Sequence, residues 1–238
     1  AIRVVSERPL VDGSREMRFF CYYVARRRWL PGGAVNNAGT VLRWFRDNFG
    51  QPEVKAAKRQ GADPYEVITE EAASVPPGAE GVLMVPFLAG ERFPVRDPEA
   101  RGVVAGLTLA HGRAHVIRAL MEGVVFTLRW IMEAMEEQGI KVDEVRVSGG
   151  GARSRVWRQI LADVLGKTVV HTGVEEASAL GAAMLAAISL GLYRDLGEAS
   201  RGMVRVRELH EPRLENHRKY GEMFRKYKEL YRVSRRLR

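Results

Sequence analysis

The sequence of 238 residues holds one cysteine, and it has no apolar run near the roughly 20 residues that a membrane-spanning helix needs. Because a single cysteine forms no disulfide within the chain, Cys21 is expected to be a packing residue in a reducing compartment. The first residues also lack the charged, apolar and small-residue order of a secretory signal. These absences exclude a disulfide-stapled fold, argue against a membrane partner and favour the cytoplasm.

The composition, with 46% hydrophobic and 28% charged residues, is that of an ordinary globular protein. The formal net charge is +9, but residues 201–238 hold thirteen Lys and Arg against five Asp and Glu, and so carry +8 of it. This basic tail allows an alternative function, a module that binds nucleic acid or a protein partner, with Tyr220, Tyr227 and Tyr231 stacking on bases. The same tyrosines follow a helical stripe, which favours packing onto the body of the protein and argues against nucleic acid.

Three consecutive glycines mark the stretch around which the chain is organised. A predicted strand over residues 145–147 is followed by Gly149, Gly150 and Gly151, and an amphipathic helix begins after Ser154. A turn without Cβ atoms lets a planar or anionic ligand approach the backbone, and Ser154 is placed to cap a helix whose first N–H groups face the loop. The pattern suits a nucleotide, although a tight connection alone explains it equally well. Its spacing is neither a dinucleotide fingerprint nor a Walker loop.

Apolar patterns along the rest of the chain predict further elements. Strands are expected over residues 2–5, 19–24, 82–87, 102–107 and 167–171, and helices over about 41–49, from 63 onward, and over 113–138, 177–190 and 211–233. This alternation indicates an α/β domain with a mainly parallel or mixed sheet. The small residues of the helix over 177–190 predict close packing against a sheet or another helix.

Turn and cap residues give more local predictions. Asp12-Gly13 is a turn dipeptide, which predicts a hairpin of the first two strands with a solvent-facing tip. Asn36 or Asn37 is expected to cap the helix that follows, and Asp63, before a proline, to open the next one.

Four motifs, in order, resemble the carboxy-terminal half of the FGGY carbohydrate kinases, and the resemblance runs from residue 2 to about 231. The most specific one, over residues 102–122, is similar to the second signature of the family. The others are 86–92 with 97–102, 148–154 with Trp157, and 179–183. The stretches 2–5, 33–37 and 86–92 resemble the gluconate and xylulose branch most.

The resemblance implies an actin-like ATPase (ribonuclease H-like) domain, with a mixed sheet flanked by helices. Residues 1–238 would be the C-terminal nucleotide-binding domain, ending in the basic tail 201–238, with ATP and Mg²⁺ as cofactors and possible self-association into a homo-oligomer. Trp157 is expected in the core, or as a wall beside the purine. The family usually has a polar side chain at the position of Arg43, and the arginine would instead reach a phosphate. The residues that the resemblance places around the nucleotide are Gly149, Gly150, Gly151, Ser154, Gly39 and Arg43.

The sequence also departs from the family. It holds no Asp-x-Gly-Thr phosphate loop, catalytic aspartate or Gly-Thr-rich phosphate hairpin, and it does not begin with methionine. We therefore expect a fragment of a longer kinase, without the N-terminal sugar-binding domain. The parent enzyme would transfer the γ-phosphoryl of ATP to a sugar or sugar acid hydroxyl, whereas the fragment alone is expected to be inactive.

Several polar residues allow two interpretations. Glu91 and Arg92 lie in a loop that either faces the cleft or forms an ion-paired clamp. Glu122 is expected to anchor a loop from inside a helix rather than to act in catalysis. His111 and His115 have the spacing of a metal pair, but the sequence places no third ligand, so a role at the helix start is favoured. No catalytic residue and no metal ligand is predicted.

Overall fold

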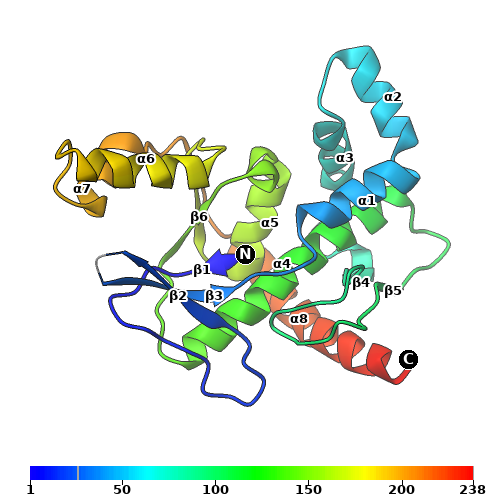
Figure 1. Cartoon of the computed structure of the whole chain (residues 1–238). Helices are drawn as coiled ribbons and strands as arrows, with labels where there is room; N and C mark the ends of the chain where they lie inside the picture. Colours follow the sequence, from blue (N-terminus) through cyan, green and yellow to red (C-terminus); the bar gives the residue numbers. More distant parts are fainter. Residues whose placement is uncertain (26, 238) are drawn as a thin grey trace.

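The computed structural model describes residues 1–25 and 27–237, which form helices packed around three small sheets (Figure 1). The strands are β1 (Ile2–Arg3), β2 (Phe20–Ala25), β3 (Arg28–Gly33), β4 (Leu83–Val85), β5 (Val103–Ala105), β6 (Glu144–Val147), β7 (Thr168–His171) and β8 (Glu208–His210). The helices are α1 (Gly39–Phe49), α2 (Gln51–Gln60), α3 (Pro64–Ala73), α4 (Arg113–Glu137), α5 (Arg155–Leu165), α6 (Ala177–Ser189), α7 (Leu196–Met203) and α8 (Leu214–Ser234), with 3-10 turns η1 (Ala79–Gly81), η2 (Gly150–Arg153) and η3 (Arg235–Leu237).

In the first sheet, β3 lies between β1 and β2 and pairs antiparallel with both. The predicted hairpin of the first two strands is therefore wrong, because a strand that we did not expect separates them. That strand ends in a proline and two glycines, which are poor strand formers. Gly32 has a φ of +152° and approaches β1 so closely that a Cβ atom would overlap the carbonyl oxygen of Ile2. Only glycine fits this contact.

The turn at Asp12 faces solvent at Arg15 and Glu16, as predicted, but the side chain of Asp12 is buried. Asp12 is 7% exposed, and its carboxylate accepts hydrogen bonds from the backbone N–H of Ser14 at 3.1 Å and of Arg18 at 2.7 Å. The Arg18 guanidinium donates to the same carboxylate at 2.9 Å and also to Glu137, at the end of α4. The guanidinium holds the pKa of Asp12 well below its usual range. The turn is thereby fastened to the central helix.

The long helix α4 matches the prediction and forms the centre of the core (Figure 1). The strand β4, whose three residues are all buried as expected, packs against α4 and α8. Gly123 makes this contact possible, since a Cβ atom on this residue would overlap the carbonyl oxygen of Met84 in β4. The helix and the strand therefore touch backbone to backbone.

Helices α1, α2 and α3 follow one another on the side of the molecule opposite α6 and α7 (Figure 1). The cap at Asp63 is confirmed, because its side chain accepts a hydrogen bond from the N–H of Tyr65 at 2.8 Å. The cap predicted at Asn36 or Asn37 is wrong. The N-cap of α1 is Ala38, which offers no side-chain acceptor, while both asparagines bind another loop.

The third sheet has the mixed pairing that the sequence indicated. β7 lies between β6, which is parallel to it, and β8, which is antiparallel. The small-residue helix α6 packs against α7, where Met184 and Ile188 meet Ala199 in a separate small core. Its alanines at 182, 183 and 186 are exposed. The predicted close packing through the small residues is therefore wrong at these positions, because the larger side chains of Met184 and Ile188 make the contact.

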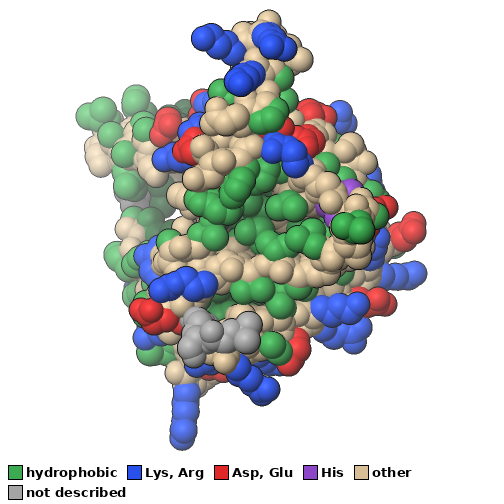
Figure 2. Space-filling view, turned by 90° about the vertical axis from the view of Figure 1, so that its right-hand side faces the viewer, with side chains coloured by type: hydrophobic (Ala, Val, Ile, Leu, Met, Phe, Trp, Pro, Cys, Tyr) green, Lys and Arg blue, Asp and Glu red, His purple; other side chains and the backbone are tan. Residues whose placement is uncertain are grey.

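The basic tail ends in α8, which packs onto the body of the protein as its apolar stripe predicted. Tyr220 and Tyr227 are fully buried, and Tyr231 is 5% exposed. They are not available to stack on bases, so the alternative of nucleic-acid binding loses its aromatic component. Figure 2 shows Lys and Arg side chains spread around one face of the molecule, with hydrophobic side chains gathered in its middle. Within the described residues, no helix is both long enough and apolar enough to cross a bilayer.

Candidate functional site

The glycine loop joins β6 to α5 and has the predicted strand, turn and helix order. Gly149 takes a positive φ of 82°, and residues Gly150–Arg153 form the 3-10 turn η2. Ser154 caps α5, since its hydroxyl accepts a hydrogen bond from the N–H of Trp157 at 3.2 Å. A Cβ atom on Gly149 or Gly150 would meet no atom within 4 Å. The loop therefore faces open space.

A cavity of about 640 Å³ lies between the edges of β1 and β6, and we refer to it as the β1–β6 cavity. Gly39, at the start of α1, and Gly151, in the glycine loop, both line it. Its walls are the segments Ala1–Val5 and Lys141–Ser148, and its floor comes from α4 and α5. The tertiary structure thus brings one residue of each predicted group, Gly39 and Gly151, to one cavity from positions far apart in the sequence.

The lining of this cavity does not include the other predicted residues, Gly149, Gly150, Arg43 and Ser154. Arg43 is exposed on α1, one turn after Gly39, and Ser154 is half-buried at the start of α5. Neither is among the residues that line the β1–β6 cavity. Trp157 is 6% exposed and lines the cavity from below, with its ring 3.6 Å from where a Cβ of Gly151 would lie. It is both a core residue and part of the cavity wall.

The loop that carries Glu91 is a clamp made of hydrogen bonds. Glu91 is 2% exposed and accepts hydrogen bonds from Asn36, Asn37 and Arg92. The side chain of Arg92 is exposed, and only its backbone N–H contributes to the clamp. The clamp interpretation is supported, but uncharged donors take the place of the ion pair that we expected.

Glu80, which the sequence did not single out, places a carboxylate beside His111 and His115, so that their ligand atoms lie within 4.8 Å of one another. The Nδ1 atom of His111 accepts the N–H of Thr108 at 2.9 Å, and that of His115 accepts the N–H of Gly112 at 3.1 Å. Each neutral ring therefore carries its proton on Nε2, where a metal would bind. This pattern supports the predicted role at the helix start rather than a metal site.

Glu122 anchors a loop from inside α4, as predicted. Its Oε1 atom accepts hydrogen bonds from the N–H of Gly78 at 2.9 Å, from Arg118 at 2.8 Å and from the hydroxyl of Tyr220 at 2.6 Å. Burial raises the pKa of the Glu122 carboxyl, and the Arg118 guanidinium acts against that shift. The residue joins η1, α4 and α8, and it does not line the β1–β6 cavity.

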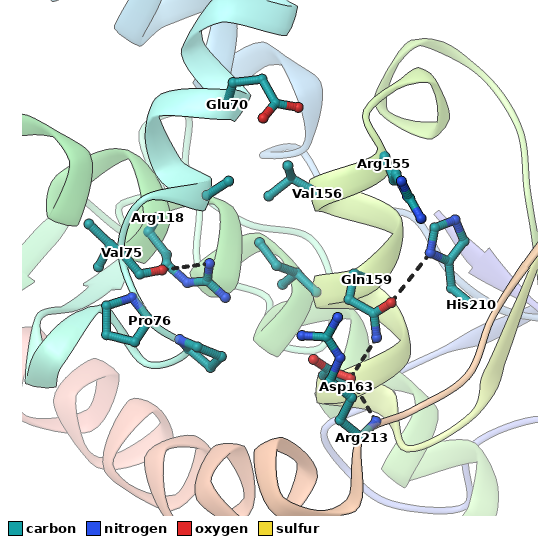
Figure 3. Close-up of a pocket in the computed structure, with 13 residues that line it drawn as sticks. Glu70, Val75, Pro76, Arg118, Arg155, Val156, Gln159, Asp163, His210 and Arg213 are labelled. Carbon is teal, nitrogen blue, oxygen red and sulfur yellow. Dashed lines mark hydrogen bonds between the residues drawn. The ribbon is translucent and has the colours of Figure 1, made fainter.

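A second cavity, of about 400 Å³, lies between α3 and α5 (Figure 3). Val156 and Ile160 line it from α5, whereas Trp157 and Leu161 of the same helix face the β1–β6 cavity. At its edge, Asp163 accepts hydrogen bonds from Gln159 at 2.9 Å and from the N–H of Arg213 at 2.8 Å. Asp163 thereby fixes the segment that leads into α8, a contact that no local pattern in the sequence signals.

In this α/β domain, the glycine loop and the start of a second helix lie on one cavity. This arrangement is typical of the class of protein that the sequence motifs indicated, a nucleotide-binding domain. Residues 4–190 match the FGGY family of carbohydrate kinases, C-terminal domain. The chain belongs to this family, and the resemblance found in the sequence is confirmed.

Its relatives include gluconate and xylulose kinases. The chain is 40% identical over 224 residues to a gluconokinase of Bacillus licheniformis, covering 94% of this chain and 43% of the relative. It is 35% identical over 192 residues to a xylulose kinase of Bacillus subtilis, covering 81% of this chain and 36% of the relative. The crystal structure of a ligand-bound xylulose kinase from Lactobacillus acidophilus matches with a TM-score of 0.84 and 27% identity. The match covers 97% of this chain and 44% of that one. The predicted actin-like fold is confirmed, and the chain spans less than half the length of these relatives.

Proposed function

We propose that residues 1–238 are the nucleotide-binding domain of a sugar kinase that transfers the γ-phosphoryl of ATP to a hydroxyl of gluconate or xylulose. One observation carries the nucleotide part of this proposal. Gly39 and Gly151 line the same cavity, and Gly149 and Gly150 beside it leave room for a ligand. The substrate part rests on the gluconate and xylulose kinases to which the chain is similar.

In this proposal the glycine loop and Ser154 bind the adenine and ribose, with Gly39 on the other side. Glycines suit this role because a ligand can approach their backbone N–H groups closely. The start of α5 also carries a partial positive charge, which favours an anionic ligand. Arg43, which is exposed one turn into α1, would reach a phosphate. A guanidinium pairs well with phosphate oxygens.

The proposed nucleotide residues include no carboxylate. Mg²⁺ is a hard cation that prefers carboxylate, phosphate and water oxygens, and it neutralises phosphate charge during transfer. We infer that the phosphates of ATP and the remaining part of the kinase would hold it. The carboxylate that accepts the proton of the sugar hydroxyl would also come from that part. The chain alone would therefore bind nucleotide and phosphorylate nothing.

The nucleotide site is tested by calorimetric titration of Mg-ADP into the chain and into a Gly150→Val variant. The added side chain has room to fit without disturbing the fold, but it projects into the space that the nucleotide would occupy. Gly181→Val, in α6, is the matched control, because its Cβ also meets no atom within 4 Å. We expect saturable binding that Gly150→Val abolishes and Gly181→Val retains. Equal binding by all three proteins would refute the site.

The catalytic part is tested by a coupled assay of ADP release with ATP, Mg²⁺ and either gluconate or xylulose. We expect no sugar-dependent turnover by the 238-residue chain. Turnover would show that the chain holds the catalytic carboxylate, contrary to the proposal.

A further inference from the structure

The carboxylate of Glu91 is the centre of a buried hydrogen-bond cluster that joins two loops. It accepts the backbone N–H of Asn36 at 2.7 Å, the side-chain amide of Asn37 at 3.1 Å and the N–H of Arg92 at 2.8 Å. A buried carboxylate is costly unless donors surround it, so these three bonds hold the side chain in one place.

Asn36 and Asn37 hold the same two loops together with further bonds. The Asn37 side chain accepts the N–H of Ala89 at 3.1 Å and donates to the carbonyl of Gly90 at 2.6 Å. The Asn36 side chain donates to the carbonyl of Ala89 at 3.2 Å. Since Asn37 is 1% exposed, water does not compete for these bonds. The segment before α1 is therefore fixed to the loop of Glu91.

This cluster lies directly before the start of α1. Gly39, the first residue of that helix, lines the β1–β6 cavity together with Gly151 of the glycine loop. The N-cap residue Ala38 gives the helix start no side-chain hydrogen bond. A helix start without a cap has little local restraint. The hydrogen bonds of the cluster around Glu91 therefore hold the segment that leads into this helix start.

The loop of Glu91 is in turn anchored to the core. The backbones of Glu91 and Asp97 exchange hydrogen bonds of 2.9 and 3.0 Å, and the Asp97 carboxylate accepts the hydroxyl of Tyr231 at 2.8 Å. Tyr231 belongs to α8 and packs against Phe87. The loop of Glu91 is therefore bonded to α8 on one side and to the segment before α1 on the other.

We infer that Glu91 is a positioning residue for the nucleotide site. Its carboxylate fixes the start of α1 relative to the glycine loop, and through that it sets the affinity for nucleotide. The inference rests on the proposed function, because it takes Gly39 and Gly151 as the two sides of a nucleotide site. Glu91 itself is not among the residues proposed to touch the nucleotide, and it would act through the start of α1.

The test compares Glu91→Gln with Glu122→Gln. Both residues are buried, at 2% and 1% exposed, and both accept three hydrogen bonds, but neither Glu122 nor its partners line the β1–β6 cavity. In Glu91→Gln, the remaining oxygen can still accept the backbone N–H groups of Asn36 and Arg92, but the new NH2 group would face the side-chain amide of Asn37, which is also a donor. We expect Glu91→Gln to weaken Mg-ADP binding about tenfold and to speed amide hydrogen exchange over residues 36–43. Glu122→Gln removes the charge that pairs with Arg118, so it should lower the melting temperature yet keep the Mg-ADP Kd within about twofold.

Asn37→Ala, which removes the amide that joins the two loops, is the second variant and should give the same pattern as Glu91→Gln. Unchanged Mg-ADP affinity in both variants, or unchanged exchange over 36–43, would overturn the inference. An equal loss of affinity in Glu122→Gln would overturn it too, since the effect would then be general destabilisation. If the unmodified chain binds no Mg-ADP, the proposed function fails, and the exchange experiment alone still decides whether Glu91 fixes the helix start.

Discussion

The hydroxyl of Tyr220 donates a hydrogen bond of 2.6 Å to the buried carboxylate of Glu122. The two residues lie far apart in the sequence, one in the basic tail and one in the helix that carries the family's second signature. Burial also raises the pKa of the Tyr220 hydroxyl, which keeps it protonated and able to donate. The tail is therefore part of the core of the domain.

Replacing Tyr220 by phenylalanine should lower the free energy of unfolding by about 1–3 kcal/mol, because a buried carboxylate loses a donor. Urea titration followed by circular dichroism measures this change. Tyr22→Phe is the matched control, because Tyr22 is 52% exposed, and it should change stability by less than about 0.5 kcal/mol. Equal effects of the two substitutions would mean that the hydrogen bond of the Tyr220 hydroxyl does not contribute to the free energy of unfolding.

Gly123→Ala should destabilise the protein by about 1–3 kcal/mol, although alanine is the better helix former. The added methyl group would overlap the carbonyl oxygen of Met84, and α4 and β4 would have to separate. Gly221→Ala, in α8, makes the same change where the new Cβ meets no atom within 4 Å. It should raise stability by up to about 1 kcal/mol. Thermal unfolding of both variants checks the opposite signs, and a gain in Gly123→Ala would contradict the contact.

The pH dependence of stability should change in a Glu71→Gln variant. Burial raises the pKa of Glu71 from 4.5 to about 6, and the neighbouring Glu53 adds to this shift, while Arg113 opposes it. The folded state therefore binds a proton more tightly than the unfolded state. The residue costs stability progressively as the pH rises from about 4.5 to about 6, and the cost is constant above that.

We expect Glu71→Gln to match the unmodified protein near pH 4.5 and to be more stable by about 1 kcal/mol near pH 7.5. Melting temperatures across this range measure the effect. Glu70→Gln, an exposed neighbour on α3, controls for the loss of one negative charge. A constant difference at all pH values would argue against the raised pKa.

The local features of the chain could be predicted because the residues that decide them are close in sequence. The caps at Asp63 and Ser154 each depend on a backbone N–H two or three residues away. The apolar stripe of α4 and the glycine loop after β6 also follow from short patterns. The motifs that resemble the family are local in the same sense.

Several features depended on contacts that no short window contains. β3 holds a proline and two glycines, and it forms a strand because β1 and β2 pair with both of its edges. Asp12 became a buried ion-pair partner because Arg18, which covers it, is also held by Glu137 at the end of α4. The carboxylate of Glu80, in η1, reaches His115 in the first turn of α4. In each case a distant partner decided the outcome.

The sequence by itself determined the family, the glycine loop, the order of the principal helices and the apolar stripe of α8, because periodic patterns and nearest-neighbour caps encode them. The tertiary structure alone decided that Gly39 and Gly151 share a cavity and that Glu91 holds the start of α1. These relations depend on how separate elements pack. A side chain's burial and its partners are set by chain segments that only folding brings together.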